Sequence, residues 1–144
     1  MLYHGIDIIE IGRIRAAIER WGPRFLSRVY TETELRDCGA ASGTPRYGSL
    51  AARWAAKEAA AKALGAGLRG LGSLHRKEFA AELGHQSALS LHDIEVLRGR
   101  QGQPLLALHG GAAALALELH LRALVLSLSH AHDYAVASVI GVVE

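Results

Sequence analysis

The alanine-rich segment at residues 50–64 constrains the fold of this chain more than any other feature. Alanine has the highest intrinsic helix propensity, so this run favours a long helix. Ser49 stands where it can cap the first turn, and Gly65 stands where helices commonly end on a left-handed residue. We therefore predict a helix over residues 50–64, with the rest of the domain packed around it.

Two patterns define the first part of the chain. Isoleucines mark residues 2–11 as an opening strand that ends near Gly12. Apolar residues then recur at helical spacing over residues 13–29, and Gly22-Pro23 is expected to break this run into two helices.

A capping box and a series of short apolar runs define the other elements. Thr31 followed three residues later by Glu34 predicts a short helix at residues 32–38. We also predict strands at residues 94–97, 105–108, 123–129 and 134–142, and helices at 77–83 and 112–120. This order predicts a single α+β domain, with a mostly antiparallel sheet packed on the long helix.

Length and composition exclude several classes of protein. With 144 residues, half of them hydrophobic, the chain has enough material for one packed domain. A net charge of +2 gives no global field to attract a nucleic acid. Glu118, His120 and Arg122 interrupt the most apolar stretch, so no membrane span is expected. A single cysteine, Cys38, and the absence of a secretory signal pattern predict a cytoplasmic protein.

Three residues of the long helix form one stripe. Trp54, Glu58 and Lys62 follow each other at intervals of four, and such residues lie above one another on a helix. The simplest interpretation is an exposed Glu58–Lys62 ion pair beside a core tryptophan. A second carboxylate, Asp7, stands among isoleucines, where an unpaired charge is costly to bury unless backbone donors or an arginine satisfy it. If Asp7 and Glu58 meet, they offer the hard oxygen ligands that magnesium prefers.

The order of the motifs resembles that of a known family. Gly5-Ile6-Asp7 is followed by Glu10 and Arg13, and residues 53–65 read RWAAKEAAAKALG. Further landmarks follow at residues 92–96, 102–104, 127–130 and 135–137. Together these motifs resemble the holo-acyl-carrier-protein synthases, the short bacterial class of 4'-phosphopantetheinyl transferases.

The resemblance implies a reaction and a set of site residues. A serine of an apo-acyl carrier protein would attack the β-phosphate of coenzyme A, and adenosine 3',5'-bisphosphate would leave. Asp7 and Glu58 would hold Mg²⁺ together with the coenzyme pyrophosphate, and Lys62 would neutralise phosphate charge. The expected contacts to the nucleotide end are Arg53, Gly65, Ser129 and His130. The base that takes the serine proton stays open between Glu58, Glu34 and a metal-bound water.

The resemblance also implies partners. It predicts a homotrimer with active sites between subunits. Four arginines, Arg13, Arg20, Arg24 and Arg28, are spaced so that they share one helical face if the break at Gly22-Pro23 is mild. That face suits the acidic carrier protein, although a simply solvated basic face has the same pattern.

One segment departs from the family pattern. Residues 68–91 are longer than the glycine loop expected at this position, and we interpret the excess as an insertion that either covers the nucleotide site or forms a surface excursion.

Two other functions fit part of the pattern. A different magnesium-dependent phosphate enzyme could use Asp7, Glu58 and Lys62 on another nucleotide, and coenzyme A binding would separate it from a transferase. A catalytically silent carrier-binding module would use only the arginine face. The two carboxylates argue against the silent module, which has no need of them.

Overall fold

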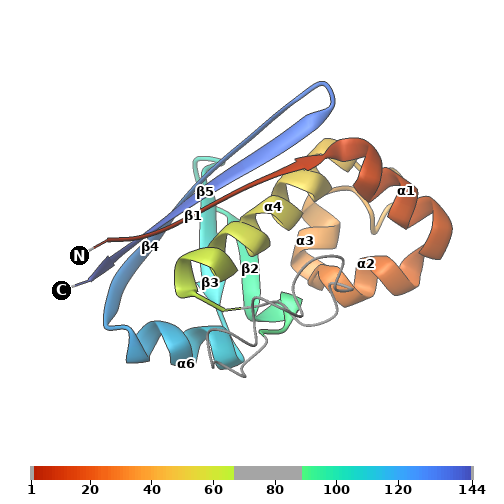
Figure 1. The fold of residues 1–144 in the computed structure, drawn as a ribbon. Coiled ribbons are helices and arrows are strands. Elements are labelled where there is room, and N and C mark those ends of the chain that lie inside the picture. The colour runs from red at the N-terminus through yellow and green to blue at the C-terminus, as the bar shows by residue number, and fades with distance from the viewer. Residues whose placement is uncertain (1, 67–88, 144) are drawn as a thin grey trace, which may run out of the picture.

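The computed structural model describes residues 2–66 and 89–143 (Figure 1). In chain order, the elements are β1 (Leu2–Glu10), α1 (Ile11–Trp21), α2 (Pro23–Val29), α3 (Glu32–Asp37), α4 (Tyr47–Leu64), the short 3-10 helix η1 (Leu91–Asp93), β2 (Ile94–Arg98), β3 (Pro104–Leu108), α6 (Gly110–Glu118), β4 (Leu121–Ala131) and β5 (Tyr134–Val143). The helix predicted at 77–83 and most of the supposed insertion lie outside the described residues.

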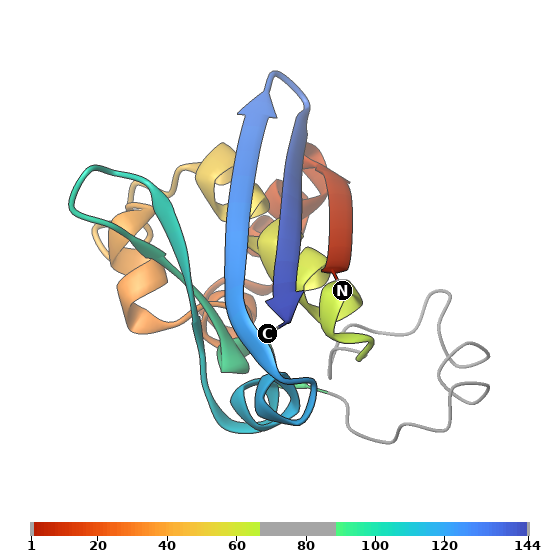
Figure 2. The same ribbon diagram turned by 90° about the vertical axis from the view of Figure 1, so that its left-hand side faces the viewer.

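The strands form two antiparallel sheets. One has the order β1-β5-β4, and the other is the β2-β3 hairpin. In β1 and β5, Leu2 pairs with Val142, so the two ends of the chain lie side by side (Figure 1). The three-stranded sheet covers one side of α4, as Figure 2 shows. The predicted α+β class, with antiparallel strands on the long helix, is confirmed; the strands divide into two sheets instead of one.

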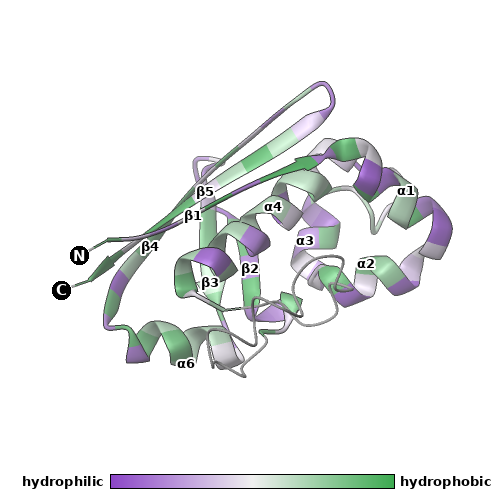
Figure 3. Cartoon of the chain, viewed as in Figure 1, coloured by the Kyte–Doolittle hydropathy of each residue, from purple (hydrophilic) through white to green (hydrophobic). Residues whose placement is uncertain are grey.

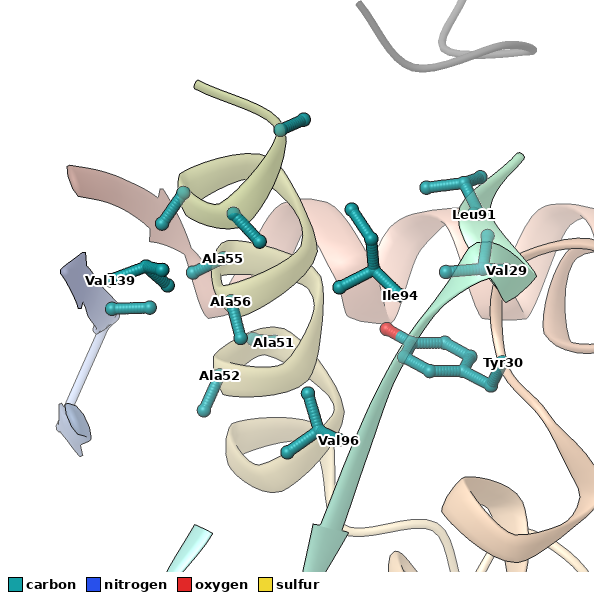
Figure 4. Close-up of a cluster of buried hydrophobic side chains, with 14 of the residues drawn as sticks. Val29, Tyr30, Ala51, Ala52, Ala55, Ala56, Leu91, Ile94, Val96 and Val139 are labelled. Atoms are coloured by element: carbon teal, nitrogen blue, oxygen red, sulfur yellow. The ribbon is translucent and has the colours of Figure 1, made fainter. Parts of the chain in front are cut away.

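Small side chains line the contact between α4 and the three-stranded sheet. The alanines of α4 are buried, and β5 faces them with Ala135, Ala137 and Val139 (Figure 4). On the opposite side, α4 packs against larger residues, including Tyr30, Ile94 and Val96. Because alanine carries only one methyl group, helix and sheet can approach each other closely.

A buried ion pair crosses the core between α3 and α4. The Lys57 ammonium donates to Glu34 Oε1 at 2.8 Å and to the carbonyl oxygens of Leu91 and Ile94 at 2.9 and 2.6 Å. Neither charged side chain has any exposed surface. Burial lowers the pKa of Lys57, and the neighbouring Glu34 carboxylate offsets part of that effect.

Both oxygens of the Glu34 carboxylate also accept hydrogen bonds from the backbone. Its Oε1 accepts the backbone N–H of Thr31 at 2.9 Å, and its Oε2 accepts that of Val96 at 3.0 Å. The Thr31 hydroxyl accepts the N–H of Glu34, so the predicted capping box is confirmed. One glutamate therefore caps α3, pairs with α4 and holds β2.

Two local expectations need correction. Helix α4 begins at Tyr47 instead of residue 50, with Arg46 as its N-cap, and Ser49 lies inside the first turn. The earlier start is stabilised because the Arg46 N–H donates to the carbonyl of Cys38 and the guanidinium of Arg15 lies 5.4 Å above the Tyr47 ring. The opening strand ends at Glu10, and Gly12 lies within α1.

The remaining elements predicted within the described residues are present with shifted ends, and the break at Gly22 is confirmed. Gly22 has φ 54° and ψ −133°, a conformation that suits a residue without Cβ, and Pro23 starts α2. No helix among the described residues is long and apolar enough to cross a membrane.

Breaking the buried pair should destabilise the fold strongly. We expect Glu34→Gln to lower the free energy of unfolding by about 3–5 kcal/mol, because the Lys57 charge then stays buried without a counter-charge. Urea denaturation measures the change. Glu19→Gln is the matched control, since its pair with Arg15 is exposed and should contribute less than about 1 kcal/mol. Equal effects of the two substitutions would contradict the central role of Lys57–Glu34.

Candidate active site

Strand β1 crosses α4 at Gly5 without room for a side chain. A Cβ on Gly5 would lie 1.9 Å from the carbonyl oxygen of Ala59 and 2.7 Å from the amide nitrogen of Ala63. Side chains alternate along a strand, so Asp7 lies on the same helix-facing side as Gly5. The neighbours Ile6 and Ile8 are 55% and 64% exposed on the other side. The sequence suggested that Asp7 lies among buried isoleucines. In the structure, the two neighbouring isoleucines are exposed and Asp7 faces the helix.

Asp7 meets the predicted stripe of α4. Its Oδ1 lies 3.0 Å from Lys62 Nζ, which also donates to the carbonyl oxygen of Ile6 at 2.9 Å. The side chains of Asp7 and Lys62 are 17% and 41% exposed. Glu58 is half-buried one turn earlier on the same stripe. Among the described residues, the partner of Asp7 is thus a lysine of α4, where the sequence suggested backbone donors or an arginine.

The third member of the stripe has a different task. The Trp54 ring stacks on Phe25 of α2, with ring centroids 6.0 Å apart. Trp54 is therefore part of the packing between α4 and α2, as expected for a core tryptophan.

The donor set suits a magnesium ion that is shared with a phosphate ligand. Among the described residues, no three histidine, cysteine or acidic side chains converge as a complete metal site. Mg²⁺ is commonly held by one or two carboxylates together with water and substrate phosphates. Asp7 and Glu58, with Lys62 beside them, fit that arrangement.

Two of the predicted site residues lie in the core. Glu34 has no exposed surface and all its described contacts are structural, which argues against its role as the base. Arg53 is only 6% exposed, which argues against direct contact with a nucleotide in a single chain. Sequence reasoning also missed the structural role of Lys57. The signal was its position, since Lys57 lies seven residues from both Leu50 and Leu64 and shares their buried face.

Two of the other predicted nucleotide contacts, His130 and Gly65, lie at opposite ends of α4. The His130 ring lies against Gly48 in the first turn of α4, where a Cβ on Gly48 would be 2.8 Å from Nδ1. The neighbouring Ser129 is exposed and, by strand alternation, points to the opposite face of the sheet. Gly65 ends α4 with φ 71°, as predicted for a left-handed cap.

Comparison with known proteins places this geometry in a family. Residues 4–139 match the model of the 4'-phosphopantetheinyl transferase superfamily. The chain belongs to that superfamily. It is 53% identical over 141 residues to the holo-[acyl-carrier-protein] synthase of Chloroflexus aurantiacus, covering 98% of both chains. It is 49% identical to the synthase of Herpetosiphon aurantiacus, again over 98% of each chain.

Solved structures of the superfamily share the fold. The complex of Chronobacterium ammoniagenes ACPS with CoA has a TM-score of 0.74 at 30% identity, covering 100% of this chain and 98% of that one. The synthase of Helicobacter pylori in complex with coenzyme A has a TM-score of 0.72 at 27% identity, covering 96% and 99%. The antiparallel α+β architecture described above is therefore that of the phosphopantetheinyl transferases.

The arginines of this transferase do not form one continuous helical face. Arg13 and Arg20 belong to α1, whereas Arg24 and Arg28 belong to α2, because Gly22 turns the chain between the helices. All four are exposed. The mild break on which a single helical face depended is therefore absent, and the basic residues are divided between two helices.

Gly5 should be required for the geometry of the transferase site. We expect Gly5→Ala to push β1 away from α4, since a methyl group cannot fit beside the Ala59 carbonyl, and to destabilise the fold by about 2 kcal/mol or more. Thermal unfolding measures the effect. Gly12→Ala is the control: nothing lies within 4 Å of its Cβ position, and alanine in a helix should be neutral or stabilising. A fully stable Gly5→Ala protein would disprove this close contact.

Proposed function

We propose that this chain transfers the 4'-phosphopantetheine group of coenzyme A to a serine of an apo-acyl carrier protein and releases adenosine 3',5'-bisphosphate. The observation that carries the proposal is the cluster formed by the Asp7–Lys62 pair between β1 and α4 and by Glu58, which lies one turn before Lys62 along the same face of α4. It occurs in a chain whose 53%-identical relative is a holo-[acyl-carrier-protein] synthase.

Each residue of the cluster has a role in phosphoryl transfer. Asp7 and Glu58 would hold Mg²⁺, which when bound neutralises charge on the pyrophosphate. Lys62 would donate to a phosphate oxygen and stabilise the charge that develops there. The serine oxygen forms a bond to the β-phosphorus while the bond to the bridging oxygen of the leaving bisphosphate breaks. Of the two glutamates considered as the base, only Glu58 lies in this cluster, and we assign the serine proton to it.

The apolar outer face of the three-stranded sheet supports an oligomer. Leu2, Ile6, Ile8, Val125, Ile140 and Val142 are exposed on this face. Figure 2 looks onto it and shows no described helix over it, and Figure 3 shows the apolar character of these strands. The hydrogen-bonded pair of His4 and Ser138 lies among these apolar side chains. Exposed apolar side chains gathered on one face and rimmed or interrupted by polar ones are typical of a protein interface. We propose that it forms the homotrimer expected for the family.

The spacing of the site residues also supports sites between subunits. The His130 ring packs against Gly48 in the first turn of α4. Gly48 and Glu58 are ten residues apart in this helix, which corresponds to about 15 Å along its axis. The 3'-phosphate and the pyrophosphate of coenzyme A are attached to one ribose and lie closer together than that. If His130 contacts the nucleotide end, it therefore serves the pyrophosphate site of a neighbouring subunit.

Carrier docking is assigned to the basic residues of α1 and α2. Arg13 and Arg20 on α1 and Arg24 and Arg28 on α2 are exposed, and the Arg20 guanidinium lies 4.9 Å above the Trp21 ring. Such a surface suits an acidic protein and would speed association. The proposed substrate is the carrier protein of fatty acid synthesis, in the cytoplasm.

The reaction can be read directly from the mass of the carrier protein. With coenzyme A and Mg²⁺, we expect apo-acyl carrier protein to gain one phosphopantetheine arm. Glu58→Ala should slow the gain by about 100-fold or more, because both a metal ligand and the assigned base are lost. Glu118→Ala, an exposed glutamate of α6, is the matched control and should react normally. No gain with several carrier proteins would overturn the proposed function and favour a silent carrier-binding module.

Assembly should depend on the outer face of the sheet. We expect Ile8→Glu to yield a folded monomer with little transferase activity, since a charge would be buried in the proposed interface. Light scattering after size-exclusion chromatography gives the mass. Leu117→Glu is the control, because Leu117 is 78% exposed on α6, away from this sheet face. A wild-type monomer with full activity would contradict the interface.

A further inference from the structure

We propose that Lys62 is an internal cation that occupies Asp7 until coenzyme A arrives, so that it competes with Mg²⁺ in the free protein. This inference rests on the proposed function and concerns the regulation of the same site. It assigns Lys62 a second role besides phosphate binding: the residue links the binding of metal to the binding of coenzyme.

The contacts of the ammonium group carry the inference. Lys62 Nζ donates to Asp7 Oδ1 at 3.0 Å and to the Ile6 carbonyl at 2.9 Å. Both acceptors belong to β1, so the ammonium lies on the strand beside the carboxylate that would bind the metal. A cation at hydrogen-bond distance from Asp7 Oδ1 occupies one side of this carboxylate. Mg²⁺ must therefore either displace the ammonium or bind Asp7 with a positive charge next to it.

The lysine is able to leave this position. Its side chain is 41% exposed, in contrast to Lys57, whose ammonium is fully buried and has three partners. An ammonium on a flexible four-carbon stem can turn toward a new acceptor without moving the helix. The pyrophosphate of coenzyme A is such an acceptor, and it carries more negative charge than Asp7.

This exchange couples the two ligands. Coenzyme A draws Lys62 away from Asp7, which removes the competing charge from the metal ligand. Metal binding is then stronger in the presence of coenzyme than in its absence, and by linkage the metal strengthens coenzyme binding by the same factor. The phosphates also bind the metal directly, so the contribution of Lys62 is seen most clearly in the protein without coenzyme.

Binding of Mn²⁺, a spectroscopic substitute for Mg²⁺, tests the inference without any transfer reaction. Free Mn²⁺ is measured by electron paramagnetic resonance during titration of the wild type, Lys62→Gln, Lys62→Arg and Arg98→Gln. We expect Lys62→Gln to bind Mn²⁺ about fivefold to tenfold more tightly in the absence of coenzyme, since one partly exposed cation beside the site is removed. Lys62→Arg keeps the charge and should resemble the wild type.

The control and the coenzyme arm separate the possible results. Arg98→Gln removes the same charge from an exposed position on β2 and should leave Mn²⁺ affinity unchanged. Coenzyme A should raise the Mn²⁺ affinity of the wild type by a larger factor than that of Lys62→Gln. Equal or weaker Mn²⁺ binding by Lys62→Gln without coenzyme would overturn the competition, whereas the proposed function would stand if the carrier protein still gained its arm.

A second result would also overturn the inference. If Asp7→Asn bound Mn²⁺ as tightly as the wild type, Asp7 would not be a metal ligand and Lys62 would have nothing to compete for. The carrier mass assay then decides separately whether the chain is a transferase.

Discussion

The buried ion pair between Lys57 and Glu34 fixes the orientation of α4, and the rest of the structure depends on that orientation. A lysine without exposed surface needs a partner for each of its donors, and only one rotation of the helix brings Nζ to Glu34 and to the carbonyls of Leu91 and Ile94. With Lys57 pointing to one side, the alanines face the three-stranded sheet. Lys62 then reaches Asp7 and Ile6 on β1, and Glu58 lies one turn before Lys62 on the same face of the helix. Lys57, which stabilises the core, is thus next in sequence to Glu58, which belongs to the proposed site.

A second constraint is the short distance between the backbones of α4 and β1. Alanines on the helix and Gly5 on the strand let two backbones meet almost directly. Such a contact places Asp7 within reach of Lys62, and a larger residue at this crossing would separate them. Because side chains alternate along a strand, Ile6 and Ile8 point away from α4 when Gly5 and Asp7 face it. Strand β1 therefore supplies both the proposed carboxylate ligand and apolar side chains of the proposed subunit interface, so under this proposal assembly and activity depend on the same strand.

The distribution of charge along α4 follows from these constraints. Lys62 in the last turn of α4 pairs with Asp7 of β1, whereas His130 of β4 lies against the first turn of the helix. In the proposed oligomer, a nucleotide that contacts both groups spans two chains, so the apolar sheet face and the separation of these groups would have one explanation. The arginines on α1 and α2 lie outside this arrangement and are free to meet a protein partner.

Apart from the short 3-10 helix η1, the sequence by itself determined the type and order of the elements that the structure describes. Alanine content, the Thr31–Glu34 capping box, Gly22-Pro23 and Gly65 act through local backbone energetics, and each is found where it was predicted, apart from shifts at element ends. The start of α4 was missed because Tyr47 is stabilised by Arg15, a contact from another helix. Local propensity holds no information about such a neighbour.

Only the tertiary structure decided which charged residues are structural and which are available for chemistry. The sequence grouped Asp7, Glu58, Lys62, Glu34 and Arg53 as site candidates. The fold pairs Asp7 with Lys62 and leaves Glu58 half-buried one turn before Lys62, whereas it buries Glu34 and Arg53. It also showed that Lys57 holds the core together. The physical reason is that the role of a charge depends on its desolvation and on its partners across the core, and both are set by residues distant in sequence.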